Sequence, residues 1–113
     1  MNGYSLEKIV EDSIHLKQVR KLDLQFGDLV FITTRNSVYF VYVLDSDSYL
    51  VSGGWFDHKG LSPLKTKITG CTWGSSIIKI DILAACGLRL EFGNRVVTTT
   101  IQRVNVLRGD GTN

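Results

Sequence analysis

Two apolar stretches, residues 29–32 and 38–44, separated by a short polar break, constrain the fold of this chain most. They consist largely of β-branched and aromatic residues, which pack well on a pleated sheet. The Arg35-Asn36 pair in the break suits a turn, so the pattern predicts an antiparallel hairpin. Both faces of these strands are apolar, which predicts burial on two sides, by a closed barrel, a second sheet or a partner subunit.

The length and composition of the chain fit one globular domain. It has 113 residues, of which 43% are hydrophobic and 21% charged, and this composition excludes a disordered chain. We divide it into an N-terminal segment (1–24), a β-barrel core (25–108) and a frayed tail (109–113). No apolar run approaches the roughly 20 residues that span a bilayer, and no export signal follows Met1. We therefore expect a cytoplasmic protein with no membrane partner.

The N-terminal segment differs in pattern from the rest. Leu6, Ile9 and Val10 lie at helical spacing, which predicts a short helix between Ser5 and about Leu22. From Ile14 onward the apolar residues alternate more as in a strand or an extended arm, so both forms stay open for this part.

The middle of the chain is rich in turn residues. Asp45-Ser46-Asp47 should reverse the chain into a short strand, Tyr49–Val51, which Gly53-Gly54 ends. Residues 55–64 contain the only proline and are expected to form a long surface loop.

The segment from Ile77 to Gly87 fits either a helix or a strand. A helix would place Lys79 and Asp81 far apart on its wheel, whereas a strand places them on one face. We predict a strand that closes in a tight turn over residues 83–86. Its opposite face would carry the isoleucines Ile78, Ile80 and Ile82.

The last third predicts a second hairpin. Alternating residues 88–92 lead into a two-residue turn, Gly93-Asn94, from which residues 96–101 return, and a final strand spans 103–107. Together these patterns predict an all-β fold with at most one short helix, a small antiparallel barrel or sandwich of about seven short strands.

Candidate catalytic and metal-ligating residues are sparse. Asp57-His58 is the only arrangement that suggests a hydrolase, and no nucleophile motif accompanies it. His15 and His58 are far apart, and Cys71 and Cys86 lack metal-ligand or redox spacing. We expect no catalytic, cofactor or metal site, and reduced thiols unless the protein is exported.

Aromatic residues near the ends of the predicted strands suggest binding. Trp55, Phe56 and Trp73 would form a surface for a peptide, a protein or a sister subunit, unless both tryptophans plug the barrel ends. The candidate ligand or partner surface comprises Trp55, Phe56, His58, Trp73, Tyr39 and Phe40.

Nucleic acid is the second hypothesis, because stacking aromatics beside basic residues suit single strands. The net charge of +2 and the pI near 8.6 are low for a dedicated nucleic-acid binder, so we rank it below protein binding. The basic residues involved would be Lys17, Arg20, Lys21, Lys59, Lys65, Lys67, Arg89, Arg95, Arg103 and Arg108.

The sequence therefore predicts a non-catalytic small β-barrel that acts as a binding or interaction module, with a small hydrolase as a third alternative. The apolar outer face of residues 29–44 further predicts a homo-oligomer. A lysine at whichever of Tyr39 and Phe40 points outward should yield a folded monomer, and a lysine at the other should unfold the core.

Overall fold

The computed structural model describes residues 13–45, 47–73 and 78–109. As predicted, the fold is all-β, with short strands in antiparallel sheets and one α-helix among the described residues. The strands and helices are β1 (Ile14–Leu16), β2 (Gln18–Arg20), η1 (Lys21–Asp23, a 3-10 turn), β3 (Leu29–Thr34), β4 (Val38–Val43), β5 (Tyr49–Gly53), α2 (Gly54–His58), β6 (Leu64–Thr66), β7 (Ile68–Thr72), β8 (Ile78–Lys79), β9 (Ile82–Ala85), β10 (Arg89–Phe92) and β11 (Ile101–Leu107).

The largest sheet has six strands in the order β1-β11-β3-β4-β5-β6. Its centre is the predicted hairpin, in which Thr33 pairs with Val38 and the chain turns between them. Thr34 closes this turn, because its hydroxyl accepts the Ser37 N–H and donates to the Ser37 carbonyl, both at 3.1 Å. The hairpin prediction is confirmed in position and register.

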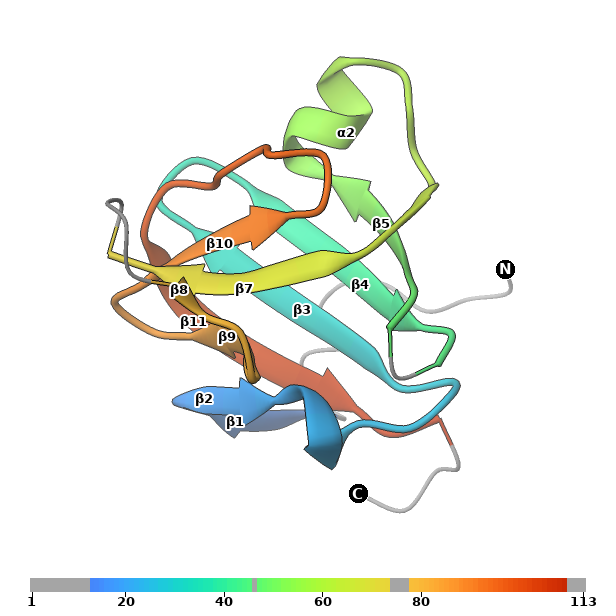
Figure 1. Cartoon of the computed structure of the whole chain (residues 1–113), viewed down its shortest axis with the longest axis vertical. Helices are drawn as coiled ribbons and strands as arrows, with labels where there is room; N and C mark the ends of the chain where they lie inside the picture. Colours follow the sequence, from blue (N-terminus) through green and yellow to red (C-terminus); the bar gives the residue numbers. More distant parts are fainter. Residues whose placement is uncertain (1–12, 46, 74–77, 110–113) are drawn as a thin grey trace.

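Two smaller sheets, β10-β7-β8 and β2-β9, complete the fold. Figure 1 shows β7, β9 and β10 lying across one face of the six-stranded sheet. No strand pairing among the described residues closes the three sheets into a barrel, so the sandwich form of the prediction describes the arrangement better.

The core lies between the six-stranded sheet and the smaller ones. Alternate residues of the large sheet point into it, among them Ile32 and Val41, both fully buried. Three aromatic rings pack against one another within it. Tyr39 contacts Phe92 and Phe56 with ring centroids 5.5 Å and 6.2 Å apart, and Phe56 lies 4.8 Å from Phe92.

The opposite face of the hairpin is also apolar, as the sequence predicted. Phe31 points outward yet is only 3% exposed, and its ring packs edge-on against Phe40 at 5.4 Å. Phe40 and Tyr42 are half-buried, and Phe26 packs beside Tyr42 while remaining 71% exposed. Tyr39 is therefore the inward residue of the pair considered above, and Phe40 the outward one.

The N-terminal segment contributes strands to the core sheets. Ile14 pairs with Val106 of β11, and Val19 pairs with Ala84 of β9. The strand interpretation of this part is confirmed, because residues 14–16 and 18–20 form strands where the expected helix would have continued to about Leu22. The first part of that expected helix, residues 5–12, lies outside the described residues. Lys21 follows as part of the 3-10 turn. In the described ranges, no helix combines the length and apolarity needed to cross a membrane.

The end of β11 is held by a buried carboxylate. Asp28 accepts hydrogen bonds of 2.9 Å from the Gln25 N–H, the Gly109 N–H and the Arg108 guanidinium. Arg108 and Gly109 are thus fixed, which corrects the expectation that the tail frays from residue 109; residues 110–113 lie outside the described residues. This Asp28 clamp joins the turn before β3 to the end of the neighbouring strand.

The second hairpin differs from the prediction in its turn. The Phe92 N–H donates to the Val96 carbonyl at 2.9 Å, so the loop has three residues, and Arg95 rather than Gly93 or Asn94 adopts a positive φ of 70°. Three-residue hairpin loops place their left-handed residue last, and the sequence pattern favoured the commoner two-residue type.

The return from this turn forms only an isolated bridge, Val97 to Glu91, before β11 begins. The final strand starts at Ile101 rather than Arg103 and pairs with β3 and β1. The strand β11 therefore joins the six-stranded sheet and not the sheet that contains β10. A local hairpin pattern in the sequence does not indicate this change of sheet.

The described part of the next segment, residues 78–87, contains strands, as predicted, but two of them. The chain turns at Ile80 and Asp81, so Ile80 is 68% exposed instead of sharing a buried face. Residues 83–85 belong to β9 and are buried, where a tight turn was expected. The prediction of a long loop over residues 55–64 is also wrong for the first residues of that range, because residues 54–58 form the helix α2.

Candidate functional site

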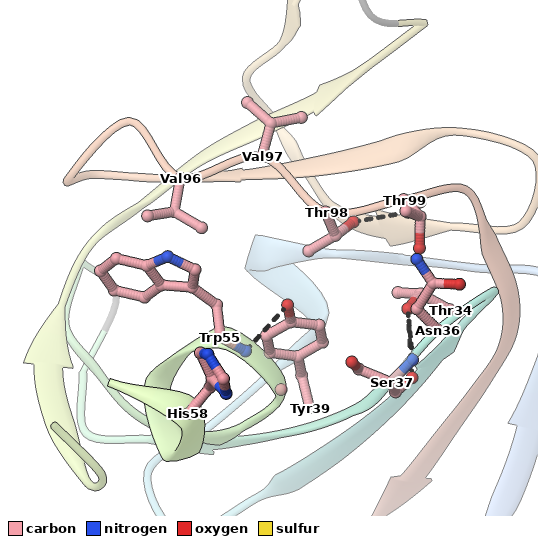
Figure 2. A pocket seen from close by; sticks show the side chains of 11 residues that line it. Thr34, Asn36, Ser37, Tyr39, Trp55, His58, Val96, Val97, Thr98 and Thr99 are labelled. Carbon is pink, nitrogen blue, oxygen red and sulfur yellow. Dashed lines mark hydrogen bonds between the residues drawn. The ribbon is translucent and has the colours of Figure 1, made fainter. Parts of the chain in front are cut away.

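A pocket of about 410 Å³ lies where α2, the β3–β4 hairpin tip and the segment after the second hairpin turn meet (Figure 2). Its lining consists of Thr34, Asn36, Ser37, Tyr39, Gly54, Trp55, His58, Val96, Val97, Thr98 and Thr99. Three of the six residues that the sequence singled out, Tyr39, Trp55 and His58, come together here. The volume falls within the range of about 300–1,000 Å³ that is typical of ligand pockets.

The helix α2 positions Trp55 and His58. It begins at two glycines with positive φ, Gly53 at 88° and Gly54 at 45°, where the chain turns sharply out of β5. The Asp57 carboxylate accepts the Gly53 N–H at 2.9 Å and fixes this junction. A side chain at Gly54 would collide with the Tyr39 ring, since an ideal Cβ lies 2.3 Å from its Cζ atom.

The pKa of Asp57 is lowered from its usual value, first by the Ser62 hydroxyl and then by the Gly53 amide. The Gly53 amide makes the well-formed bond, whereas the buried Ser62 Oγ has no partner of regular hydrogen-bond geometry in the described part of the chain. We therefore regard the amide as the main stabilising partner. Asp57 stays ionised and serves the β5–α2 junction.

Tyr39 connects the pocket to the core. Its ring is buried against Phe56 and Phe92, and its hydroxyl accepts the Trp55 backbone N–H at 3.3 Å. The hydroxyl proton remains available to a ligand, because a phenol both accepts and donates. Figure 2 shows the Tyr39 hydroxyl and the Trp55 ring beside the same opening, with Val96 across from the indole.

The far wall is formed by residues 96–99. The Thr98 hydroxyl is satisfied, since it accepts the Leu90 N–H at 3.1 Å and donates to the Thr99 carbonyl at 2.7 Å. The Thr99 hydroxyl is buried and has no hydrogen-bond partner among the described residues. A buried unpaired hydroxyl is costly. This oxygen has almost no accessible surface, so it does not offer a contact at the pocket opening.

The pocket contains no lysine, arginine, aspartate or glutamate in its lining. It offers an aromatic surface, two valines and several hydroxyl or amide groups. This arrangement suits an uncharged ligand with both apolar and hydrogen-bonding parts.

The other three predicted site residues lie elsewhere. Phe56 is fully buried in the core, and Phe40 lies on the outer face of the large sheet. Trp73 follows β7 and is 57% exposed, with the Lys79 ammonium 5.2 Å from its ring centroid. Neither tryptophan is fully buried, and the two do not form one surface.

The residues that sequence analysis missed are those of the hairpin tip and the threonine-rich wall. The run of three threonines, 98–100, between a turn and a strand was the available signal. Repeated hydroxyls at that place are compatible with an ordinary strand, so the signal is weak.

Asp57, His58 and the two cysteines were the candidates for catalysis or metal binding. Asp57 bonds to a backbone amide rather than orienting His58. No group of three or more histidine, cysteine or acidic side chains lies close enough to hold a metal in the described ranges. Cys71 is buried, and burial raises its pKa to about 11, which makes it a poor nucleophile.

Comparison of the chain with protein-family models, with curated proteins and with solved structures finds no match. The function is therefore argued from the site alone.

Proposed function

We propose that this protein is a non-catalytic binding module and that its ligand occupies the pocket between α2 and residues 96–99. The observation that carries the proposal is the meeting of the Trp55 ring, the Tyr39 hydroxyl and the Val96 side chain at one opening whose lining has no lysine, arginine, aspartate or glutamate. Aromatic surface supplies binding free energy, and a few fixed polar groups supply orientation.

Nucleic acid is the less favoured candidate. None of the ten basic residues lines the pocket, and several of them already have partners. Lys67 pairs with Asp47 at 3.1 Å, and the Lys21 ammonium donates to the Ile68 carbonyl at 2.6 Å. A phosphate backbone needs neighbouring free cations, so these pairings argue against it.

Self-association through the outer face of the large sheet belongs to the same proposal. Phe40 and Tyr42 are half-buried there, and the exposed Phe26 extends the apolar area. A second copy could cover this face by two-fold pairing.

The two free cysteines suit a reducing compartment, in line with a cytoplasmic protein.

The test uses the Trp73→Phe variant, which leaves Trp55 as the only tryptophan. Fluorescence and amide NMR spectra would be recorded with capped uncharged tripeptides, with N-acetylglucosamine and with a short oligothymidylate. We expect one uncharged probe to shift Trp55 and residues 96–99, and Trp55→Ala to abolish the amide shifts of residues 96–99. Trp73→Ala is the matched control on the other exposed indole.

Two results would contradict the proposal. One is oligothymidylate binding that weakens steeply with salt while the uncharged probes have no effect, which would favour nucleic acid. The other is the absence of any pocket shift at millimolar concentrations of every probe.

A further inference from the structure

The wall of the pocket has a backbone edge that is paired on one side only. Val97 lies opposite Glu91 of β10, and the flanking bonds run from Phe92 N–H to the Val96 carbonyl and from Thr98 N–H to the Leu90 carbonyl, both at 2.9 Å. In an antiparallel ladder, a residue between two such bonds directs its own N–H and C=O away from its partner strand.

Val97 therefore presents one donor and one acceptor on the side away from β10. Neither group takes part in a backbone hydrogen bond within the described ranges of the chain. Val97 as a whole residue is 43% exposed. A half-paired backbone position of this kind can pair with one residue of an added strand.

This edge borders the pocket. Val97 and its neighbours Val96 and Thr99 are part of the lining, opposite Trp55. In a strand laid along the edge, side chains that point the same way are about 7 Å apart, two residues at 3.3–3.4 Å each. One such side chain can enter the pocket while the backbone pairs with Val97.

We propose that the ligand is an extended peptide segment that adds a strand against Val97 and places one uncharged side chain between Trp55 and Thr99. This inference rests on the proposed function and names its ligand class. Backbone pairing supplies affinity in this mode of recognition, and the pocket selects the side chain. The lining holds no lysine, arginine, aspartate or glutamate that could pair with an acidic or basic side chain, so an uncharged side chain is the preferred one.

The experiment starts from a phage-displayed library of random heptapeptides selected on the full chain. The selected sequences should share an uncharged residue at one position. A synthetic copy of the best peptide is then N-methylated at one amide at a time. Loss of affinity should alternate along the peptide, about tenfold at each amide that pairs and about twofold or less at the others.

The Val97→Pro variant tests the protein side. In the wild type, the Val97 N–H makes no backbone hydrogen bond within the described residues, so the fold should tolerate proline at this position. The unfolding temperature of the variant checks this. Peptide affinity should fall about tenfold, since one intermolecular hydrogen bond is lost. Val97→Ala keeps the N–H and should lose markedly less. In the wild type, peptide binding should slow hydrogen exchange at the Val97 amide.

Each outcome has a distinct meaning. A uniform response to N-methylation, or unchanged Val97 exchange in the bound state, would overturn strand addition even if Val97→Pro fails to fold. Selection of no peptide, combined with binding of N-acetylglucosamine in the pocket, would overturn this inference and leave the proposed function standing. No occupant of any kind would overturn both.

Discussion

The Gly54→Ala substitution gives the sharpest test of how the pocket is built. Gly54 has a φ of 45°, and an added Cβ would lie 2.3 Å, 2.5 Å and 2.7 Å from the Cζ, Cε1 and hydroxyl oxygen of Tyr39. These distances are far inside normal contact, and the ring cannot move freely because Phe56 and Phe92 pack against it. We expect the substitution to displace Tyr39 from the Trp55 amide.

The magnitude follows from two costs. A left-handed backbone costs a residue with a side chain about 1–2 kcal/mol. Forcing an extra methyl group into a packed site costs about 1–3 kcal/mol more. Alanine also restricts the unfolded chain, which recovers about 0.4–1 kcal/mol. The net loss in the free energy of unfolding should be about 1–4.5 kcal/mol.

The assay is urea unfolding followed by tryptophan fluorescence, with Gly60→Ala as the matched control. Gly60 has a φ of 70° and no atom within 4 Å of its added Cβ, so it carries the backbone cost without the collision. The difference between the two variants isolates the contact with Tyr39. Equal losses, to within about 0.5 kcal/mol, would refute the packing argument.

Three further predictions concern other parts of the molecule. Burial raises the pKa of Cys71 from 9.0 to about 11, so the thiol stabilises the fold below pH 9 and loses this effect, about 2–3 kcal/mol, as the pH rises from 9 through 11. Urea titrations across that range should show a steeper decline for the wild type than for Cys71→Ala. Arg95→Gly should raise the free energy of unfolding by up to about 1 kcal/mol, because glycine relieves the left-handed φ; a measurable loss would show that the Arg95 side chain has a structural role. Phe40→Lys should give a folded monomer and Tyr39→Lys an unfolded chain, and light scattering that finds the wild type monomeric at high micromolar concentration would remove self-association from the proposal.

The sequence predicted the fold class because the strand signals are local. The hairpin of residues 29–44 is marked by its composition and by its turn, and its register follows from these. The pairing of β11 with β3 joins residues far apart in the chain, and no local pattern marks it. The turn at Ile80 was missed because alternation in the sequence looks the same in one strand as in two.

The candidate site was predicted in part. Trp55 and His58 were chosen for their residue type near strand ends, and Tyr39 as part of the hairpin. Phe56 looked equivalent to Trp55 in sequence. The two residues are adjacent in α2, and the helix directs the Phe56 ring into the core and the Trp55 ring toward the pocket opening. The hydroxyl groups of Thr98 and Thr99 differ in their bonding, which depends on partners that sequence does not reveal.

The Asp28 clamp has a consequence for folding kinetics. Its ion pair with Arg108 spans 80 positions in the chain, and it can form only after β11 has reached β3. Contacts of such long range close late, because the loop between them must first be ordered. Interactions absent from the folding transition state act mainly on the unfolding rate. We therefore expect the clamp to slow the opening of the folded protein more than it speeds its formation.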